Sequence, residues 1–369
     1  MSEVRETVLE IDLDSLEHNY HYLRSKLTPS TLFMGVVKAS GYGSDSLVIA
    51  KKLEALGIDY LAVAYVREGV LLREAGVKVP ILVLHPQAVN FEMLIENCLE
   101  PSIYSSRILK EFIAASQRAK QKDYPVHLKF NTGLNRLGFR ENEIATILTL
   151  IKDVPGIKVK GIFSHLAASE DHKEVAFTRK QIAGFKSIVG QLEAQLGYPC
   201  IKHLLNTSGI LNYPENQWDM ARSGIGLYGY GNDKAFDTFL KPVASLKTII
   251  SQLHNLEPNE SVGYNRAFLS SERRTTATLP IGHADGIGRQ YGNGRASVLV
   301  NGNKAPIIGN VCMDMLMIDV TGIDCKEGDE VLVFGKPHTA ADFAAGANTI
   351  SYELLTGIAP RVKRIYKTS

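Results

Sequence analysis

A lysine between an apolar segment and a glycine-containing turn is the first group in this sequence that could do covalent chemistry. Leu32–Val37 predicts a buried parallel strand, and Lys38 is followed by Gly41, Tyr42 and Gly43. In barrels of parallel strands, chemistry gathers at the carboxyl ends of the strands. A lysine desolvated there is shifted toward its neutral, nucleophilic form, which can make a Schiff base. A solvated loop lysine is the alternative interpretation of this stretch.

Polar and glycine-containing segments follow or end four further strand-like runs. These segments are Asn131–Gly138, Ser164–Ala167, Asn206–Gly209 and Arg222–Gly229. Hydroxyl and backbone amide donors in the last two segments are what a phosphate site in a barrel requires. A lysine that faces a phosphate site across a barrel mouth predicts a phosphorylated aldehyde cofactor, and pyridoxal phosphate fits that description.

The elements that would position these groups alternate regularly from Thr31 onward. Helical patterns separate eight strand-like runs within about 230 residues, which favours a closed β/α barrel over an open sheet. The runs are Leu32–Lys38, Tyr60–Tyr65, Pro80–Leu84, Pro101–Tyr104, Val126–Asn131, Val159–His165, Ile201–Asn206 and Met220–Tyr228.

A second domain is predicted after this alternation stops near residues 230–234. Short strands and turns then follow, with two helices near 339–345 and 350–355. The strands are Ala244–Leu253, Thr275–Pro280, Ala296–Val300, Lys304–Ile308, Met315–Val320 and Glu330–Phe334. We therefore expect a β/α barrel over residues 1–240 and a mostly β domain over 241–369, with residues 1–11 a candidate strand for the second domain.

Composition limits the classes of function. With 45% apolar residues among 369, the chain can bury a large core, and a formal charge of +2 argues against nucleic acid or anionic membrane as the main partner. No apolar run is long enough to span a bilayer, and the first residues lack a signal-peptide pattern. Four cysteines without metal-ligand spacing are expected to be reduced thiols in a cytoplasmic protein, and no metal site is predicted.

Seven short motifs occur in order over nearly the whole chain. They are V-V-K-A-x-x-Y-G (36–43), N-R-L-G-F (135–139), S-H-L-A (164–167), R-x-G-I-x-L-Y-G (222–229), V-G-Y (262–264), P-I-G-x-A-D-G (280–286) and V-C-M-D (311–314). Each motif is weak alone, but seven in this order are highly specific. On these motifs the sequence resembles the alanine racemase family.

The resemblance implies a fold, an activity and a quaternary state. The fold is an N-terminal (β/α)8 barrel followed by a mostly β domain. The activity is the pyridoxal-phosphate-dependent interconversion of L- and D-alanine for peptidoglycan, in a homodimer with shared active sites. Lys38 would hold the cofactor, and Tyr264 would be a second base that reaches the partner's barrel, because racemisation needs one base on each face of the substrate carbon. A half-buried strand tyrosine is the alternative for Tyr264.

The same resemblance implies a set of cationic and imidazole side chains around the cofactor. Arg222 would face the pyridine nitrogen, where an always-charged donor disfavours a protonated ring. His165 would hydrogen-bond Arg222, and Arg136 would reach the cofactor's phenolic oxygen or the substrate carboxylate. Lys129 matches a position that is often carbamylated, although Asn131 follows where Asp is usual. Structural ion pairs and a satisfied core histidine are the alternatives.

Binding residues for phosphate and substrate are implied in the same way. The phosphate ligands would be Tyr42, Thr207, Gly224, Ile225 and Tyr352. The backbone amide of Met313 would bind the substrate carboxylate, with core packing as its alternative role. His283 replaces a usual tyrosine and Asn310 a usual arginine, which implies a less basic and differently shaped access channel.

Three other functions stay open at this point. A barrel-type pyridoxal-phosphate decarboxylase would pair the pyridine nitrogen with a carboxylate, whereas Arg222 is cationic. A non-catalytic pyridoxal-phosphate-binding protein would consist of the barrel alone, without the domain that carries Tyr264. A racemase for serine or for many amino acids is the third alternative, and such enzymes tend to be exported.

Overall fold

The computed structural model describes residues 6–368, and the chain divides into two compact units. The first, called the barrel unit, holds residues 17–41 and 46–241. The second, called the sheet unit, holds residues 6–16, 42–45 and 242–368. The short segment 42–45 therefore belongs to the sheet unit, although barrel residues flank it on both sides in the sequence.

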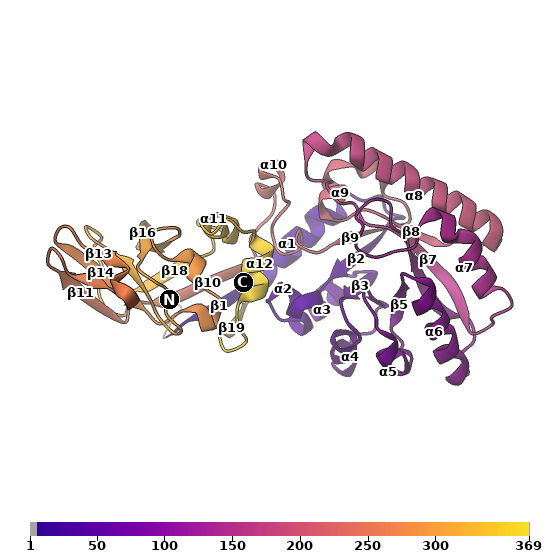
Figure 1. Cartoon of the computed structure of the whole chain (residues 1–369), viewed down its shortest axis with the longest axis horizontal. Helices are drawn as coiled ribbons and strands as arrows, with labels where there is room; N and C mark the ends of the chain where they lie inside the picture. Colours follow the sequence, from indigo (N-terminus) through magenta and orange to yellow (C-terminus); the bar gives the residue numbers. More distant parts are fainter. Residues whose placement is uncertain (1–5, 369) are drawn as a thin grey trace. The chain divides into compact units, whose positions relative to one another are not determined.

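Eight parallel strands close into a barrel in the barrel unit (Figure 1). They are β2 (Leu32–Val36), β3 (Tyr60–Val63), β4 (Ile81–Val83), β5 (Glu100–Ile103), β6 (Tyr124–Lys129), β7 (Ile157–Phe163), β8 (Ile201–His203) and β9 (Met220–Ser223). Most residues in these strands are buried, as expected where helices cover the outside of a parallel sheet. The predicted closed β/α barrel is confirmed.

The helices of this unit present apolar faces to the barrel. In α6 (Ser106–Arg118), Ile108, Leu109, Phe112 and Ala115 are buried on one face, and the Ser105 hydroxyl caps the helix by accepting the Ile108 amide. The other helices that lie partly or wholly in this unit are α1 (Leu13–Arg24), α2 (Lys38–Tyr42), α3 (Ser46–Ala55), α4 (Val66–Glu74), α5 (Phe91–Glu96), α7 (Ile144–Ile151), α8 (Val175–Leu196), α9 (Thr207–Asn212) and α10 (Lys234–Asp237).

The barrel strands end earlier than the apolar runs predicted. The largest difference is in the last strand, expected over Met220–Tyr228, because β9 ends at Ser223. Residues 224–229 instead form successive tight turns, in which the amides of Leu227, Tyr228 and Gly229 donate to carbonyls three residues earlier. Apolar residues in these turns are buried as deeply as those of a strand, so hydrophobicity alone could not mark the strand end.

Nine strands form one continuous sheet in the sheet unit, in the order β11-β14-β17-β16-β15-β18-β10-β1-β19. β1 pairs antiparallel with β10 and parallel with β19. The strands are β1 (Val8–Asp12), β10 (Ala244–Ile249), β11 (Gln252–Leu256), β14 (Arg274–Leu279), β15 (Ser297–Val300), β16 (Asn303–Ile308), β17 (Leu316–Asp319), β18 (Glu330–Phe334) and β19 (Lys363–Lys367). A hairpin of β12 (Ser261–Val262) and β13 (Phe268–Leu269) and the helices α11 (Ala340–Ala345) and α12 (Ser351–Gly357) complete the unit.

One predicted strand of this unit is wrong. The run Ala244–Leu253 was expected to be a single strand but divides into β10 and β11. The break comes at Ile250 and Ser251, whose amides donate to Asp329 beside β18 and to Thr278 of β14, respectively. The chain thus changes partners between two consecutive residues while its apolar alternation continues. The strands β12, β13 and β19 were not anticipated.

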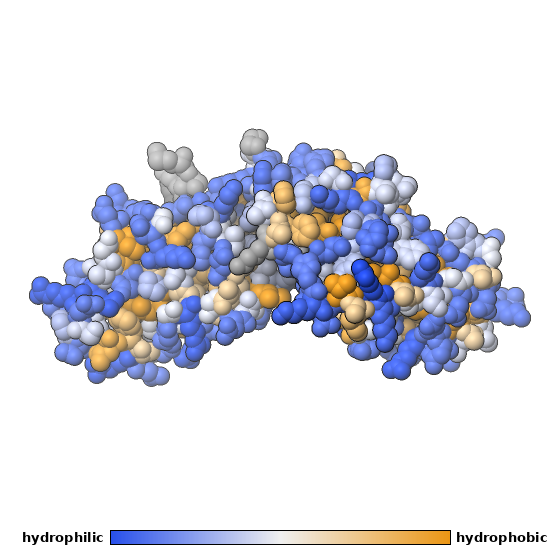
Figure 2. Space-filling model, turned by 90° about the horizontal axis from the view of Figure 1, so that it is seen from above, coloured by the Kyte–Doolittle hydropathy of each residue, from blue (hydrophilic) through white to orange (hydrophobic). Residues whose placement is uncertain are grey.

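The face of the molecule seen in Figure 2 is mostly polar, with apolar patches. Within residues 6–368 no helix is long and apolar enough to cross a membrane. The same residues contain no group of three or more metal-binding side chains, and all four cysteines are free thiols.

Candidate active site

Lys38 begins a left-handed turn directly after the first barrel strand. Positive φ angles near 50–60° occur at Ala39, Ser40, Gly41 and Tyr42, a conformation that is strained for residues other than glycine. The Ala39 amide is held by the Glu68 carboxylate at 2.7 Å. Burial and then the nearby positive charge of Arg136 lower the pKa of Lys38, against the opposing charge of Glu68. The turn therefore presents an amine that loses its proton more readily than a solvated lysine.

Arg222 lies on β9 with only 4% of its surface exposed. Its Nη2 donates to the carbonyls of Ser164 (2.8 Å) and Leu204 (3.1 Å) and lies 3.4 Å from His165 Nδ1. Nη1 lies 2.8 Å from His203 Nδ1. Burial lowers the pKa of Arg222 to about 9, so the guanidinium stays charged at neutral pH. The predicted contact between His165 and Arg222 is present.

Positive charge accumulates around Lys129, at the carboxyl end of β6. Burial, then Arg136, Arg222 and Lys38, lower the pKa of Lys129 to about 8. Burial and the same cations hold the pKa of His165 well below its usual value, so its imidazole is neutral. The predicted residues Lys38, Lys129, Arg136, His165 and Arg222 are thus brought within electrostatic reach of one another. Such a cluster suits a ligand that carries several negative charges.

A stabilising effect is expected when Lys129 is replaced by methionine. Below about pH 8 both folded and unfolded chains carry the Lys129 proton, and the buried charge destabilises the fold. Between about pH 8 and 10.5 only the unfolded chain keeps that proton, so the penalty fades as pH rises. The melting temperature of cofactor-free Lys129→Met should therefore exceed that of the parent at pH 7, by a margin that shrinks toward pH 10.

The exposed Lys51→Met variant serves as the control for lost charge, and its melting temperature should match the parent at both pH values. A lower melting temperature for Lys129→Met at pH 7 would contradict the argument. It would point instead to a negative charge on Lys129, as a carbamate provides.

Hydroxyl groups and backbone amides converge after β8 and β9. The Thr207 and Ser223 hydroxyls are 2.9 Å apart, and the Gly226 amide donates to Thr207 Oγ1 at 3.3 Å. A Cβ on Gly226 would lie 2.6 Å from Thr207 Cγ2, so only glycine fits there. Among the described residues, the buried amides of Gly224 and Ile225 donate to no other residue. These donors, together with the cationic cluster, fit the phosphate and aldehyde of pyridoxal phosphate.

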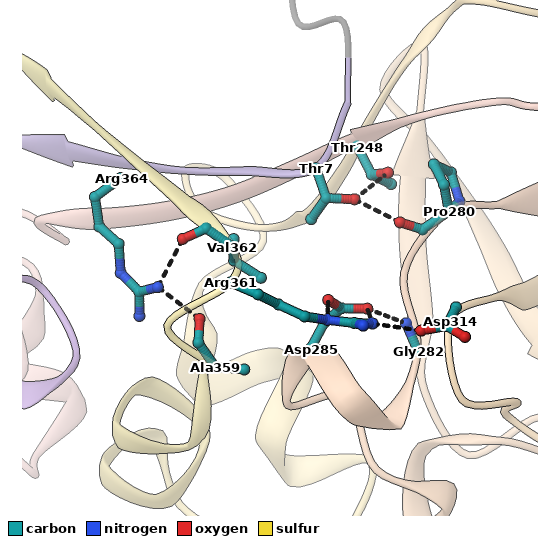
Figure 3. Close-up of polar contacts among 10 residues, drawn as sticks. All are labelled: Thr7, Thr248, Pro280, Gly282, Asp285, Asp314, Ala359, Arg361, Val362 and Arg364. Atoms are coloured by element: carbon teal, nitrogen blue, oxygen red, sulfur yellow. Dashed lines mark hydrogen bonds and ion pairs between the residues drawn. The ribbon is translucent and has the colours of Figure 1, made fainter.

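Tyr42 and Tyr352 meet in the sheet unit, with ring centroids 6.1 Å apart. Burial and then Tyr352 raise the pKa of Tyr42, so its hydroxyl is a neutral donor. Arg364 links the segment that follows Tyr42 to the segment that follows α12, because its guanidinium donates to four backbone carbonyls. Two of these hydrogen bonds are drawn in Figure 3. The four acceptors belong to Gly43, Ile358, Ala359 and Val362.

Gly43→Ala is expected to destabilise the protein more than a matched glycine substitution. Gly43 has φ +81°, and a Cβ there would lie 2.1 Å from the Leu355 carbonyl oxygen. Gly57 has a similar φ of +86°, but a Cβ there would meet nothing within 4 Å. Gly57→Ala should cost about 1–2 kcal/mol for the left-handed backbone alone. Gly43→Ala should lower the urea midpoint further, and equal midpoints for the two variants would refute the steric argument.

Tyr264 and Met313 line a cavity of about 1010 Å³ within the sheet unit. Tyr264 is 73% exposed and Met313 is 59% exposed, and Met315 beside them is also exposed. Asn310 Nδ2 holds the Tyr264 carbonyl at 3.1 Å. Exposed apolar side chains gathered at one cavity are typical of a surface that meets another molecule.

Arg361 joins Asp285 to Asp314, as Figure 3 shows, and so fixes the loop that carries Met313. Its guanidinium donates twice to Asp285 (2.7 and 3.0 Å) and once to Asp314 (2.7 Å). Asp285 also accepts the Gly282 amide at 2.8 Å, and the Met313 carbonyl accepts the Ala284 amide at 3.0 Å. One arginine thus fixes residues 282–285 against residues 312–314 and sets the direction of the Met313 backbone.

Several residues of this site escaped the sequence interpretation. Arg361 carries no local signature, and the motif at 280–286 that contains Asp285 does not reveal its partner, because the pairing joins segments 76 residues apart. His203 contacts Arg222 directly, and His127 contacts His203 in turn. Neither histidine was singled out from the sequence. A signal did exist for His127, because it stands two residues before Lys129 and so lies on the same face of its strand.

Comparisons with known proteins agree over the whole chain. The family models named alanine racemase, N-terminal domain, and alanine racemase, C-terminal domain, match residues 11–232 and 243–366. The chain is 35% identical to the alanine racemase of Desulfovibrio desulfuricans, over 97% of each protein. It is 38% identical to that of Halothermothrix orenii, over 98% of this chain and 97% of the relative.

Solved structures give the same result. The alanine racemase of Bartonella henselae with covalently bound pyridoxal phosphate has a TM-score of 0.90 and 30% identity, over 98% of this chain and 99% of that chain. The alanine racemase of Bacillus anthracis with bound L-Ala-P has a TM-score of 0.91 and 28% identity, over 99% and 96%. Two family models in order and identity above one third over the full length show that the chain belongs to the alanine racemase family.

Proposed function

We propose that this enzyme interconverts L- and D-alanine in the cytoplasm with Lys38 and Tyr264 as its two bases, and so supplies D-alanine for peptidoglycan. Family membership carries the activity, which is that of an isomerase dependent on pyridoxal phosphate. The observation that carries the site is the cationic cluster of Lys38, Lys129, Arg136 and Arg222 at the barrel mouth. The barrel is proposed to bind the cofactor, and the sheet domain to supply Tyr264.

Pyridoxal phosphate, when bound, withdraws electrons from the α-carbon of the substrate and makes its α-hydrogen acidic. Lys38 would hold it covalently, since burial favours the neutral amine. Arg222 would face the ring nitrogen as a charged donor. The phosphate would be bound by Thr207, Gly224, Ile225, Tyr42 and Tyr352.

The proton transfer is assigned to groups on opposite faces of the substrate carbon. Lys38 would exchange the α-proton on one face and Tyr264 on the other, so that removal by one base and return by the other inverts the centre. The Met313 amide and Arg136 would bind the substrate carboxylate. The clamp made by Arg361 keeps that amide in place during the reaction.

The sheet unit by itself supports a site shared between two chains. Asp45 bonds Tyr366 of β19, at one end of the nine-stranded sheet, whereas Tyr264 shares its cavity with Thr276 and Thr278 of β14 near the other end. Figure 1 shows β14 and β19 well separated. Lys38 precedes Tyr42 by four residues, a span of at most about 14 Å. Seven strand spacings of about 4.8 Å separate β14 from β19, so Tyr264 is proposed to meet the Lys38 of a partner subunit.

The alternatives are not favoured. A decarboxylase would place a carboxylate at the ring nitrogen, but the described contacts of Arg222 are with carbonyls and imidazoles. A cofactor-binding protein without activity would not require the sheet domain, which matches its own racemase family model. Alanine is preferred over serine because the relatives reported above are alanine racemases.

The function is tested by adding pyridoxal phosphate and L-alanine to the purified chain and measuring D-alanine by chiral chromatography. Equal amounts of the two enantiomers are expected at equilibrium, because they have the same free energy in water. L-serine at the same concentration serves as the comparison for substrate breadth. Release of carbon dioxide without D-alanine would identify a decarboxylase instead.

Tyr264→Phe is expected to restrict proton exchange to one enantiomer. The variant keeps the ring but loses the hydroxyl, so only the face served by Lys38 would still exchange its α-proton. In deuterated water, one enantiomer of alanine should gain deuterium without inversion, while racemisation falls by about 10²–10⁴-fold. Tyr65→Phe, at another exposed tyrosine, is the control. Equal exchange into both enantiomers by Tyr264→Phe would remove this tyrosine from its role.

A further inference from the structure

A row of buried polar side chains crosses the barrel interior beneath Arg222. Arg222 Nη1 lies 2.8 Å from His203 Nδ1, His203 Nε2 lies 3.0 Å from His127 Nδ1, and His127 Nε2 lies 2.8 Å from Glu100 Oε2. The other oxygen of Glu100 accepts from Lys160 Nζ at 2.6 Å. The row joins the first residue of β5 to the carboxyl end of β9.

Neighbouring residues of the barrel interior leave space for this row of side chains. β6 and β8 are not neighbours in the barrel, so the contact between His127 and His203 runs through its interior. Both rings are fully buried, and His203 stacks on Phe163 with ring centroids 4.6 Å apart. A Cβ on Gly161 would lie 2.1 Å from His127 Nδ1, so glycine on β7 makes room for the first ring.

The arginine at one end, which only donates, and the carboxylate at the other, which only accepts, set the direction of every hydrogen bond between them. Arginine has only donors, so His203 Nδ1 must accept and His203 Nε2 must carry the hydrogen. His127 Nδ1 then accepts from His203, and His127 Nε2–H donates to the Glu100 carboxylate. Both imidazoles are therefore neutral, and each carries its hydrogen on Nε2.

The charges agree with this direction. Burial tends to raise the pKa of Glu100, but the hydrogen bond from His127 and the hydrogen bond and charge of Lys160 outweigh it and leave that pKa below its usual value. Burial and then the charge of Arg222 hold the pKa of His203 well below its usual value. A carboxylate at one end thus faces a guanidinium at the other through two neutral, polarisable rings.

We propose that Glu100, His127 and His203 are positioning residues for Arg222, through which a carboxylate at the amino end of the barrel orients the guanidinium that faces the cofactor. The inference rests on the proposed function, because it deepens the role of Arg222 at the ring nitrogen. If both rings carried their hydrogen on Nδ1, His203 would oppose Arg222 donor to donor. The guanidinium would then lose the acceptor that holds Nη1.

Glu100→Gln is a sharp test because it should reverse the whole row without changing its shape. Lys160 has only donors, so we expect the new amide to turn its oxygen toward Lys160 and its NH2 group toward His127, at the cost of the acceptor that His203 offers Arg222. His127 would then carry its hydrogen on Nδ1, and so would His203. Adding Lys160→Met frees the amide to turn its oxygen back to His127, which should restore the original direction.

The direct readout is nitrogen NMR of the full chain labelled with ¹⁵N-histidine. We expect both buried histidines to carry hydrogen on Nε2 in the parent, on Nδ1 in Glu100→Gln, and again on Nε2 in the double variant. Lys160→Met alone should keep the parent tautomers. A parent spectrum with either hydrogen on Nδ1 overturns the proposal without any variant. Unchanged tautomers in a folded Glu100→Gln protein overturn it as well.

The second readout measures whether the change in histidine tautomers alters the ring nitrogen of the cofactor and the rate of racemisation. In protein loaded with pyridoxal phosphate labelled at its ring nitrogen, the ¹⁵N shift should move in Glu100→Gln and return in the double variant. The turnover number for racemisation should fall about ten-fold or more and recover in parallel, as for other outer-shell partners. A purely structural carboxylate would not be rescued by removing a second charge, so failure of rescue overturns the relay. Failure of the proposed function would differ, because then the parent itself would form no D-alanine.

Discussion

Lys38→Ala is expected to abolish racemisation and covalent attachment of pyridoxal phosphate together. Lys38 is a half-buried amine just after β2, with a pKa lowered by burial and by Arg136. Removal of the amine takes away both the covalent anchor and one of the two proposed bases. Because a positioned base alone contributes about 10²–10⁴-fold, formation of D-alanine should fall by at least about 10³-fold.

Two measurements separate this role from simple misfolding. Borohydride reduction followed by peptide mass analysis should find the cofactor on the peptide that contains Lys38 in the parent and on no peptide in the variant. Lys51→Ala, at an exposed position of α3, should keep both label and activity. A labelled lysine elsewhere in Lys38→Ala, with racemisation retained, would mean that another amine does this work.

Mixing Lys38→Ala with Tyr264→Ala is expected to restore activity that neither variant has alone. If each site takes Lys38 from one chain and Tyr264 from its partner, a mixed dimer has one intact site and one site that lacks both residues. With free exchange about half of the dimers are mixed, so about one quarter of the parent activity should return. The measurement is D-alanine formation after co-expression with two different affinity tags.

Purification through both tags in turn isolates the mixed dimers, whose activity should then rise to about half of the parent value. Each variant alone, carried through the same purification, supplies the baseline. If isolated mixed dimers stay as inactive as that baseline, both bases come from one chain. The separation of β14 and β19 in the sheet unit would then need another explanation.

Much of the barrel could be predicted because its signals are local. Apolar runs separated by helical patterns identify parallel strands, and all eight runs correspond to strands of the closed barrel. Their ends could not be predicted equally well. Residues 224–229 are as apolar and buried as a strand, and only their hydrogen bonds show that they turn. The break after Ile249 was missed for the same reason, since a change of pairing partner leaves the alternation intact.

In the candidate site, too, residues close to strand ends could be predicted, whereas contacts between distant segments could not. Lys38, His165 and Arg222 lie in predicted strand runs and Thr207 directly follows one, so their common location at the barrel mouth was expected. The electrostatic grouping of Lys129 with three other cations depends on distances across the mouth, which a linear pattern does not contain. The Arg361 clamp depends on a pairing between distant loops. Neither arrangement has a periodicity that a sequence could display.

The sequence by itself determined the chemistry, because the residue types at strand ends and seven ordered motifs already implied a Schiff-base lysine, a phosphate site and the alanine racemase family. The tertiary structure alone decided how those groups are held. Glu100, His127, His203 and Arg222 come from four strands spread over more than 120 positions, and they meet only because the sheet closes into a barrel. The direction of their hydrogen bonds is set by contacts in space, with a donor at the Arg222 end of the row and an acceptor at the Glu100 end, and no local sequence pattern connects these side chains.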